Sequence, residues 1–222
     1  MGARTQEERV WIPHGALMLD GRFLLGSGLA GLVCHPHPSY GGNMDNNVVL
    51  AACSALAEIG ASVLRFNFRE SSAAHGAMAE GEEQVQQVKS AMKFLRSKTG
   101  CESSRFVLVG YSFGAWVGLR ALHETEPILG WVAVAPPVGI WEFSFARAID
   151  GRKMILAGSH DNFCPLDLVQ DLFRCLHEPK EMEILEGADH FFWGFEKKLK
   201  HAIEARVCSW AKGLGDCPAW KG

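Results

Sequence analysis

Short apolar segments alternate with segments of helical periodicity along most of the chain, and this alternation limits the possible fold most strongly. We expect strands at residues 31–34, 61–66, 106–109, 131–135, 153–157 and 181–185. Apolar residues spaced three or four apart predict helices at 46–59, 82–98, 115–123, 166–176 and 195–210. Strands that alternate with helices pair into a mainly parallel sheet covered by helices on both faces. The sequence therefore predicts an α/β fold.

The first 25 residues differ from this pattern. Apolar segments at 10–12, 16–19 and 22–25 lie close together, and Asp20-Gly21 separates the last two. Asp-Gly between apolar segments is typical of a hairpin turn. We therefore expect an antiparallel strand or hairpin at the N-terminus, turned at Asp20-Gly21.

Length and charge narrow the class of protein. The 222 residues are 48% apolar and carry 25 acidic against 22 basic side chains, a net charge of −3. A length of this order fits one domain, which we predict at 1–212 with a loose tail at 213–222. The balanced charge does not favour nucleic acid as a partner. It leaves open whether the protein is a monomer or a homodimer.

The N-terminal residues and the cysteines bear on localisation. The N-terminus has no apolar signal core, and no apolar segment reaches the roughly 18 residues of a membrane helix. The seven cysteines form no C-x-x-C pair, so neither a disulfide framework nor a cysteine zinc site is indicated. We expect a cytoplasmic protein that does not associate with a membrane.

Functional side chains of a parallel sheet collect after the carboxyl ends of its strands. Gly110-Tyr111-Ser112-Phe113-Gly114 follows the strand at 106–109 and precedes the helix at 115–123. G-x-S-x-G between a strand and a helix is typical of a sharp turn that exposes a nucleophilic serine. The alternative is a glycine-rich turn with an incidental serine. We predict that Ser112 is the nucleophile.

A serine needs a base, and the base needs a group that orients it. Asp161 follows the strand at 153–157, and His190 follows the last strand. The order Ser112, Asp161, His190 is that of α/β-hydrolases. We predict that His190 is the general base and Asp161 the orienting carboxylate. Asp189 is the alternative acid, although a residue adjacent to the base rarely reaches its ring.

The segment after the strand at 31–34 is where a second oxyanion donor is expected. The first donor is predicted to be the backbone N–H of Phe113, directly after the nucleophile. Pro36 and Pro38 in this segment have no N–H to donate. His37 or Ser39 therefore supplies the second donor, and we favour His37. His35 and His37 could also be metal ligands, but Ser39 and Tyr40 stand where further ligands are needed. We therefore predict no metal site.

These residues resemble the small, lidless α/β-hydrolases related to dienelactone hydrolase, over about residues 10 to 212. The resemblance rests on His35-Pro36-His37-Pro38, Gly41-Gly42, Met44, Asn46-Asn47-Val48-Val49, Phe66-Asn67-Phe68-Arg69, Gly110-Tyr111-Ser112-Phe113-Gly114 and Gly187-Ala188-Asp189-His190-Phe191-Phe192. It implies an α/β-hydrolase fold in which Ser112, Asp161 and His190 form the catalytic triad. The segment from Glu70 to Gly76 departs from the glycine-rich stretch usual in the family, so substrate preference does not transfer.

The predicted function is hydrolysis of an ester, thioester or related acyl bond of a small molecule, through an acyl-enzyme and without a cofactor. An acyltransferase or peptidase with the same triad, or a non-catalytic ligand-binding protein, is the alternative. About 17 residues separate the strands at 131–135 and 153–157, too few for a lid domain. Four aromatic residues could line the pocket or pack in the core: Tyr40, Trp141, Phe192 and Trp193.

Overall fold

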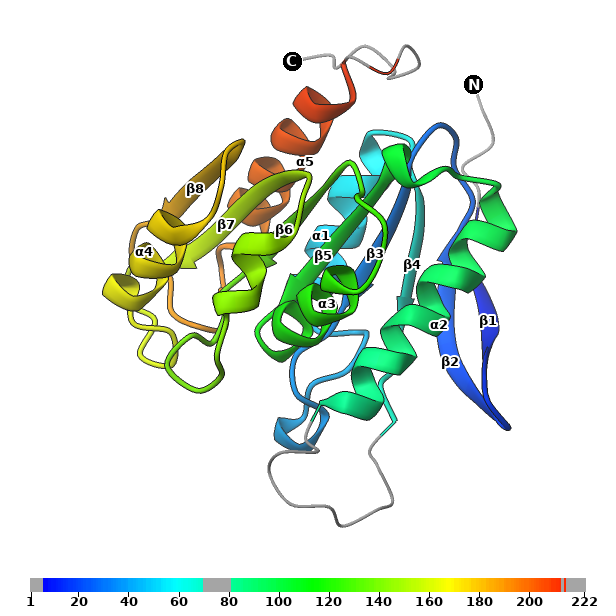
Figure 1. Ribbon diagram of the computed structural model, residues 1–222, viewed down its shortest axis with the longest axis horizontal. Helices are drawn as coiled ribbons and strands as arrows, with labels where there is room; N and C mark the ends of the chain where they lie inside the picture. Colours follow the sequence, from blue (N-terminus) through cyan, green and yellow to red (C-terminus); the bar gives the residue numbers. More distant parts are fainter. Residues whose placement is uncertain (1–5, 70–80, 213, 215–222) are drawn as a thin grey trace.

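The fold of the protein is described from a computed structural model, for residues 6–69, 81–212 and 214. In these parts of the chain the strands form one eight-stranded sheet in the order β1-β2-β4-β3-β5-β6-β7-β8 (Figure 1). The strands are β1 (Glu8–His14), β2 (Leu17–Leu24), β3 (Ala30–Cys34), β4 (Ser62–Phe66), β5 (Phe106–Tyr111), β6 (Gly130–Val134), β7 (Arg152–Gly158) and β8 (Lys180–Leu185).

The pairing divides the sheet into two parts. β1 pairs with β2 and β2 with β4 in antiparallel fashion, whereas the six strands from β4 through β3, β5, β6 and β7 to β8 run parallel to one another. Strands β3 to β6 are buried along their whole length, as expected for parallel strands covered on both faces. The predicted mainly parallel sheet with an antiparallel N-terminal hairpin is confirmed.

The position predicted for the hairpin turn is wrong. Asp20 and Gly21 lie inside β2, where they pair with Trp11 and Val10 of β1. The chain turns instead at Gly15 and Ala16, and Gly15 has a φ of +57°, a conformation that glycine adopts without strain. Asp20 binds Arg9 of β1 through a side-chain ion pair 2.9 Å long, so its carboxylate stabilises the strand pair.

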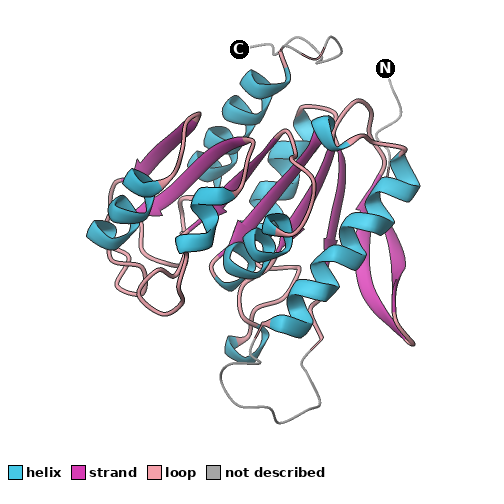
Figure 2. Cartoon of the chain, in the orientation of Figure 1, coloured by secondary structure: helices cyan, strands magenta, loops and turns pink. Residues whose placement is uncertain are grey.

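Helices cover both faces of the sheet, as predicted (Figure 2). α1 and α5 pack on each other on one face, while α2 and α3 pack side by side on the other, together with α4. Their bounds are α1 (Asn47–Glu58), α2 (Glu82–Thr99), α3 (Phe113–His123), α4 (Leu166–Cys175) and α5 (Glu196–Ala211).

Capping residues mark where the helices begin and end. Asn46 caps α1 by accepting a hydrogen bond from the N–H of Val48, and Gly100 ends α2 with a φ of +64°.

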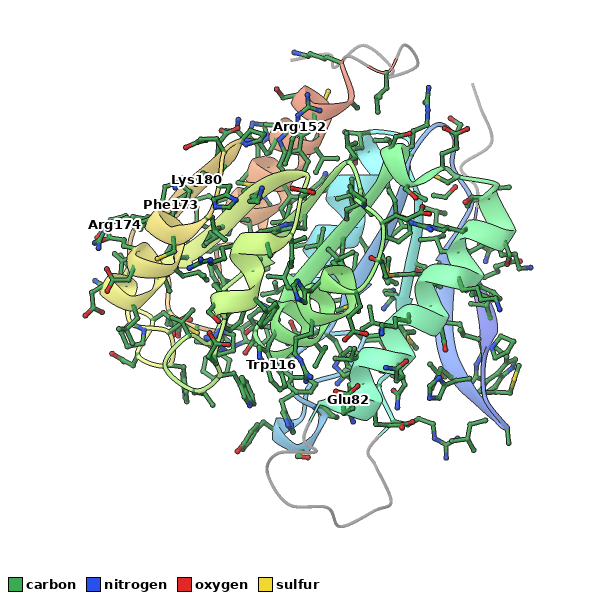
Figure 3. All side chains as sticks on the ribbon, in the orientation of Figure 1. Glu82, Trp116, Arg152, Phe173, Arg174 and Lys180 are labelled. Atoms are coloured by element: carbon green, nitrogen blue, oxygen red, sulfur yellow. The ribbon has the colours of Figure 1, made fainter. Side chains whose placement is uncertain are left out.

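At the outer strand of the sheet, Lys180 Nζ donates to the carbonyl groups of Phe173, Arg174 and Leu176 at the end of α4. Figure 3 shows Lys180, Phe173 and Arg174 gathered there. Lys180 thereby joins the start of β8 to α4.

Two predicted segments lie largely or wholly outside the described residues. Of the predicted tail at 213–222, only Leu214 is described, and its carbonyl group accepts a hydrogen bond from Arg105. The 70–76 segment that departs from the family pattern also lies outside them. None of the helices described here is both long and apolar enough to cross a membrane.

Candidate active site

Four loops meet at the carboxyl ends of the parallel strands. They follow β3, β5, β7 and β8, and they carry His37, Ser112, Asp161 and His190. Trp116 and Glu82, at the N-terminal ends of α3 and α2, are labelled at this end of the molecule, in the lower part of Figure 3. The topology therefore gathers the predicted site residues at one edge of the sheet.

Ser112 occupies a strained turn between β5 and α3. Its φ of 53° and ψ of −119° lie in a region that residues other than glycine rarely adopt. The flanking glycines make this turn possible. A Cβ atom at Gly110 would lie 2.4 Å from Cα of Ala115, and one at Gly114 would lie 2.3 Å from the carbonyl oxygen of Cys34. The G-x-S-x-G sequence thus permits a tight turn with Ser112 at its apex.

Ser112, His190 and Asp161 are joined by hydrogen bonds. His190 Nε2 lies 3.1 Å from Ser112 Oγ, and His190 Nδ1 lies 2.8 Å from Asp161 Oδ2. An ionised carboxylate only accepts, so Nδ1 carries the proton and Nε2 is the acceptor for the hydroxyl proton of Ser112. All three residues are less than 9% exposed, so water competes little for these bonds.

The carboxylate of Asp161 is held by its own loop. The backbone N–H groups of Phe163 and Cys164 each donate to Asp161 Oδ1 at 2.8 Å, which leaves Oδ2 directed at His190. Asp189, the alternative acid, accepts instead from the N–H groups of Phe191 and Phe192. Asp161 is therefore the carboxylate that meets the imidazole, and Asp189 stabilises the turn after β8.

Two buried residues that the sequence did not single out surround His190. The hydroxyl of Tyr111 donates to the carbonyl group of His190 at 2.8 Å. The thiol of Cys164 lies 3.6 Å from His190 Nδ1 and donates to the carbonyl oxygen of Ala135 at 3.3 Å. Burial raises the pKa of the Cys164 thiol, which keeps it protonated. Both contacts confine the loop and ring of His190.

Phe113 and His37, the residues that carry the two predicted oxyanion donors, have side chains in contact. Phe113 is the first residue of α3, where helix N–H groups have no partner within the helix. The rings of His37 and Phe113 are 4.4 Å apart, and Gly114 lets the backbone after β3 approach the start of α3. The N–H of Ser39 donates to His37 Nδ1 at 3.2 Å. The N–H of Ser39, the alternative second donor, is thus engaged within its own loop.

His35 supports the loop rather than the reaction. Its Nδ1 lies 2.6 Å from the carbonyl oxygen of Pro36, and its Nε2 accepts a hydrogen bond from the N–H of Phe68 at 2.8 Å. Burial lowers the pKa of His35 to about 4, so the ring is neutral. Because both ring nitrogens are engaged with backbone groups, His35 does not have a lone pair directed at a metal.

The four aromatic residues predicted for the pocket have different surroundings. Trp141 is half-buried and lies 6.1 Å from His37, with the two rings nearly parallel. Tyr40 also contacts His37 and is 87% exposed. Phe192 is fully buried against Tyr111, which corresponds to the core-packing alternative, and Trp193 is 69% exposed. Trp141 and Tyr40 thus both lie against His37, the residue predicted to supply the second oxyanion donor.

The paired asparagines at 46 and 47 have separate roles. Asn46 caps α1. The side-chain amide of Asn47 donates to the carbonyl oxygen of Phe191 at 2.9 Å and to Glu196 at 3.1 Å. Asn47 therefore ties the start of α1 to the loop that carries His190.

Comparison with known proteins agrees with the fold. The model of the dienelactone hydrolase family matches residues 65–214, more than half of the chain. The chain belongs to the dienelactone hydrolase family. The uncharacterized protein RP471 from Rickettsia prowazekii is 36% identical over 180 residues, which are 78% of this chain and 75% of that protein.

Solved structures support the same assignment. XC6422 from Xanthomonas campestris, described as an α/β serine hydrolase without a lid, is 27% identical over 97% of each chain, with a TM-score of 0.82. An α/β serine hydrolase homologue from Coxiella burnetii is 26% identical over 93% of this chain and 99% of that one, with a TM-score of 0.80. The α/β-hydrolase fold expected from the sequence is confirmed, and the family supports a hydrolase.

Proposed function

We propose that this member of the dienelactone hydrolase family is a serine hydrolase that cleaves carboxylic esters of small molecules through an acyl-enzyme. The observation that carries the proposal is the chain of hydrogen bonds from Ser112 through His190 to Asp161, at 3.1 and 2.8 Å. A hydroxyl bonded to an imidazole whose other nitrogen meets a buried carboxylate is the arrangement that activates a serine.

Acylation begins when Ser112 Oγ attacks the carbonyl carbon of the ester and His190 Nε2 takes the hydroxyl proton. The carbonyl oxygen becomes an oxyanion, which the N–H groups of Phe113 and His37 are proposed to bind. When the tetrahedral intermediate collapses, the bond to the alcohol oxygen breaks. His190 returns its proton to that oxygen, so the alcohol leaves as a neutral molecule and the acyl group remains on Ser112.

Deacylation repeats these steps with water. His190 takes a proton from the water as its oxygen attacks the acyl carbon, and a second oxyanion forms in the same place. When this intermediate collapses, the bond to Ser112 Oγ breaks, Ser112 recovers the proton from His190, and the carboxylic acid leaves. Asp161 keeps the proton on Nδ1 throughout and stabilises the imidazolium that forms twice in each cycle.

Access of water favours hydrolysis over transfer to another acceptor. Tyr40 and Trp193, on the loops after β3 and β8, are more than two-thirds exposed. Residues 135–151, between β6 and β7, contain a single short 3₁₀ segment, Ser144–Ala148. The exposed aromatic side chains and the short connection between β6 and β7 support access of water to an acyl group on Ser112. A peptidase or acyltransferase would use the same steps with a different bond or acceptor.

A panel of p-nitrophenyl esters with acyl chains of increasing length tests the proposal. The wild-type protein is expected to release nitrophenol, and the Ser112→Ala variant is expected to lose the activity down to the rate without enzyme. Circular dichroism of both proteins controls for folding. Turnover that persists in a folded Ser112→Ala variant would overturn the mechanism, and a wild type inactive on every ester would overturn the assignment as an esterase.

A further inference from the structure

Two exposed phenylalanines lie against the imidazole of His190. The ring of Phe163 is 5.2 Å from that of His190, and the ring of Phe191 is 5.7 Å from it. The two phenylalanine rings are 6.0 Å apart, edge to face. Phe163 is 54% exposed and Phe191 46% exposed. Together the three rings form an aromatic group that is open to solvent on one side.

Both phenylalanines are held in place by the loops that build the site. The N–H of Phe163 donates to Asp161, and the N–H of Phe191 donates to Asp189. The carbonyl group of Phe191 also accepts from Asn47 of α1. Large apolar side chains that remain half exposed on well-anchored backbone are candidates for ligand contact, because packing in the core does not account for them.

The mechanism indicates which part of the substrate reaches these rings. His190 Nε2 must donate its proton to the alcohol oxygen during acylation, so the alcohol portion lies beside the imidazole at that step. The oxyanion side, with His37 and Phe113, lies on the other loops. Groups that flank His190 therefore contact the leaving alcohol.

We propose that Phe163 and Phe191 form a binding subsite for an aromatic alcohol portion of the substrate. The inference rests on the proposed esterase function and specifies its substrate class. A phenyl ring of the alcohol would add a third aromatic contact to an edge-to-face pair, the geometry that aromatic rings favour. The subsite selects the leaving group and is indifferent to the acyl group.

Two esters that share an acyl group separate this subsite from the rest of the site. Propyl butyrate and 3-phenylpropyl butyrate give the same butyryl-enzyme, and their alcohols are unhindered primary alcohols that differ by one terminal phenyl ring. The wild-type protein is expected to have a kcat/KM about tenfold higher for the phenylpropyl ester, as one aromatic contact of about 1.4 kcal/mol implies. The Phe163→Ala and Phe191→Ala variants are each expected to reduce this ratio several-fold, and the double variant to bring it close to one.

The propyl ester and a distant aromatic residue provide the controls. The phenylalanine variants are compared by the ratio of their two kcat/KM values, because both rings also pack against His190 and a general effect on the imidazole would lower the rates of both esters alike. Trp11→Ala on β1 removes an aromatic side chain that is 50% exposed and should leave both esters unaffected.

Failure of the subsite can be told apart from failure of the esterase function. Equal kcat/KM values for the two esters in the wild type, or equal losses on both esters in the phenylalanine variants, would overturn the subsite while hydrolysis remained. Absence of hydrolysis of either ester by the wild type, together with an unreactive Ser112, would overturn the proposed function itself.

Discussion

His35 shows how one buried side chain can stabilise a loop and make folding depend on pH. It is 1% exposed, and its Nε2 accepts the N–H of Phe68 only while that nitrogen is unprotonated. The pKa of His35 is about 4 in the folded protein, compared with 6.5 for an unperturbed histidine. The unfolded chain therefore binds more protons between these two values, and the folded protein loses stability as the pH falls through them.

The variant His35→Gln isolates this contribution. We expect the wild-type free energy of unfolding to fall by about 3 kcal/mol more than that of the variant between pH 6.5 and pH 4. From about pH 8 upward His35 is neutral in both states, so the difference between the proteins should be constant there. Denaturant unfolding at several pH values measures it, with exposed His160→Gln as control. Parallel wild-type and His35→Gln curves would contradict the account.

Two neighbouring carboxylates allow the orienting role to be tested residue by residue. Asp161 meets His190 Nδ1, whereas Asp189 accepts two backbone N–H groups of its own turn. Asparagine keeps the shape of either side chain, but at position 161 its amide can face His190 as a donor and so stabilise the wrong tautomer.

We expect Asp161→Asn to lower kcat about 10³-fold or more, and Asp189→Asn to lower it less than about threefold, because Asn Oδ1 can still accept the two N–H groups. Stopped-flow or steady-state rates on one p-nitrophenyl ester measure both. A larger loss in Asp189→Asn than in Asp161→Asn would reverse the assignment of the acid.

At the scale of elements, the start of α3 and the loop after β3 depend on each other through Gly114. A Cβ atom there would lie 2.3 Å from the carbonyl oxygen of Cys34 and 2.6 Å from that of His35, and neither backbone atom can move without moving the loop. This contact brings Phe113 and His37 together, so the proposed oxyanion site depends on the absence of a side chain at Gly114.

Gly114→Ala is expected to lower kcat about 10²-fold or more, since separating the two N–H groups removes stabilisation of the developing charge. Gly118→Ala in the same helix is the matched control, because its Cβ would meet the flexible side chain of Leu108 at 2.9 Å. We expect the control to keep most of its activity. Comparable rates for Gly114→Ala and the wild type would show that the close approach does not serve the reaction.

Hydrophobic periodicity was sufficient to predict the alternating elements, whereas turn chemistry was not. The predicted helix at 46–59 corresponds to α1 and the one at 82–98 to α2, because a helix face that packs on a sheet must repeat every three to four residues. Asp20-Gly21 forms no turn because pairing with β1 keeps it extended, and Gly15 makes the turn instead. Local propensity yields to strand pairing in such cases.

At the scale of the whole molecule, the site lies at the carboxyl ends of the parallel strands, where loops from four distant segments meet. Ser112, Asp161 and His190 could be predicted because each follows a strand, and parallel strands end at one edge of their sheet. Their neighbours Tyr111, Cys164 and Phe163 could not, since those contacts join residues up to 79 positions apart and leave no periodic pattern in the sequence.

The most direct test of the central claim is covalent labelling of the intact protein with a fluorophosphonate, followed by mass spectrometry of the labelled peptide. Such a probe reacts only with a serine whose hydroxyl is activated by a base. We predict stoichiometric labelling on Ser112, strong slowing in His190→Ala, and no label in Ser112→Ala. A folded wild-type protein that remains unlabelled, or that carries the label on another residue, would contradict the account.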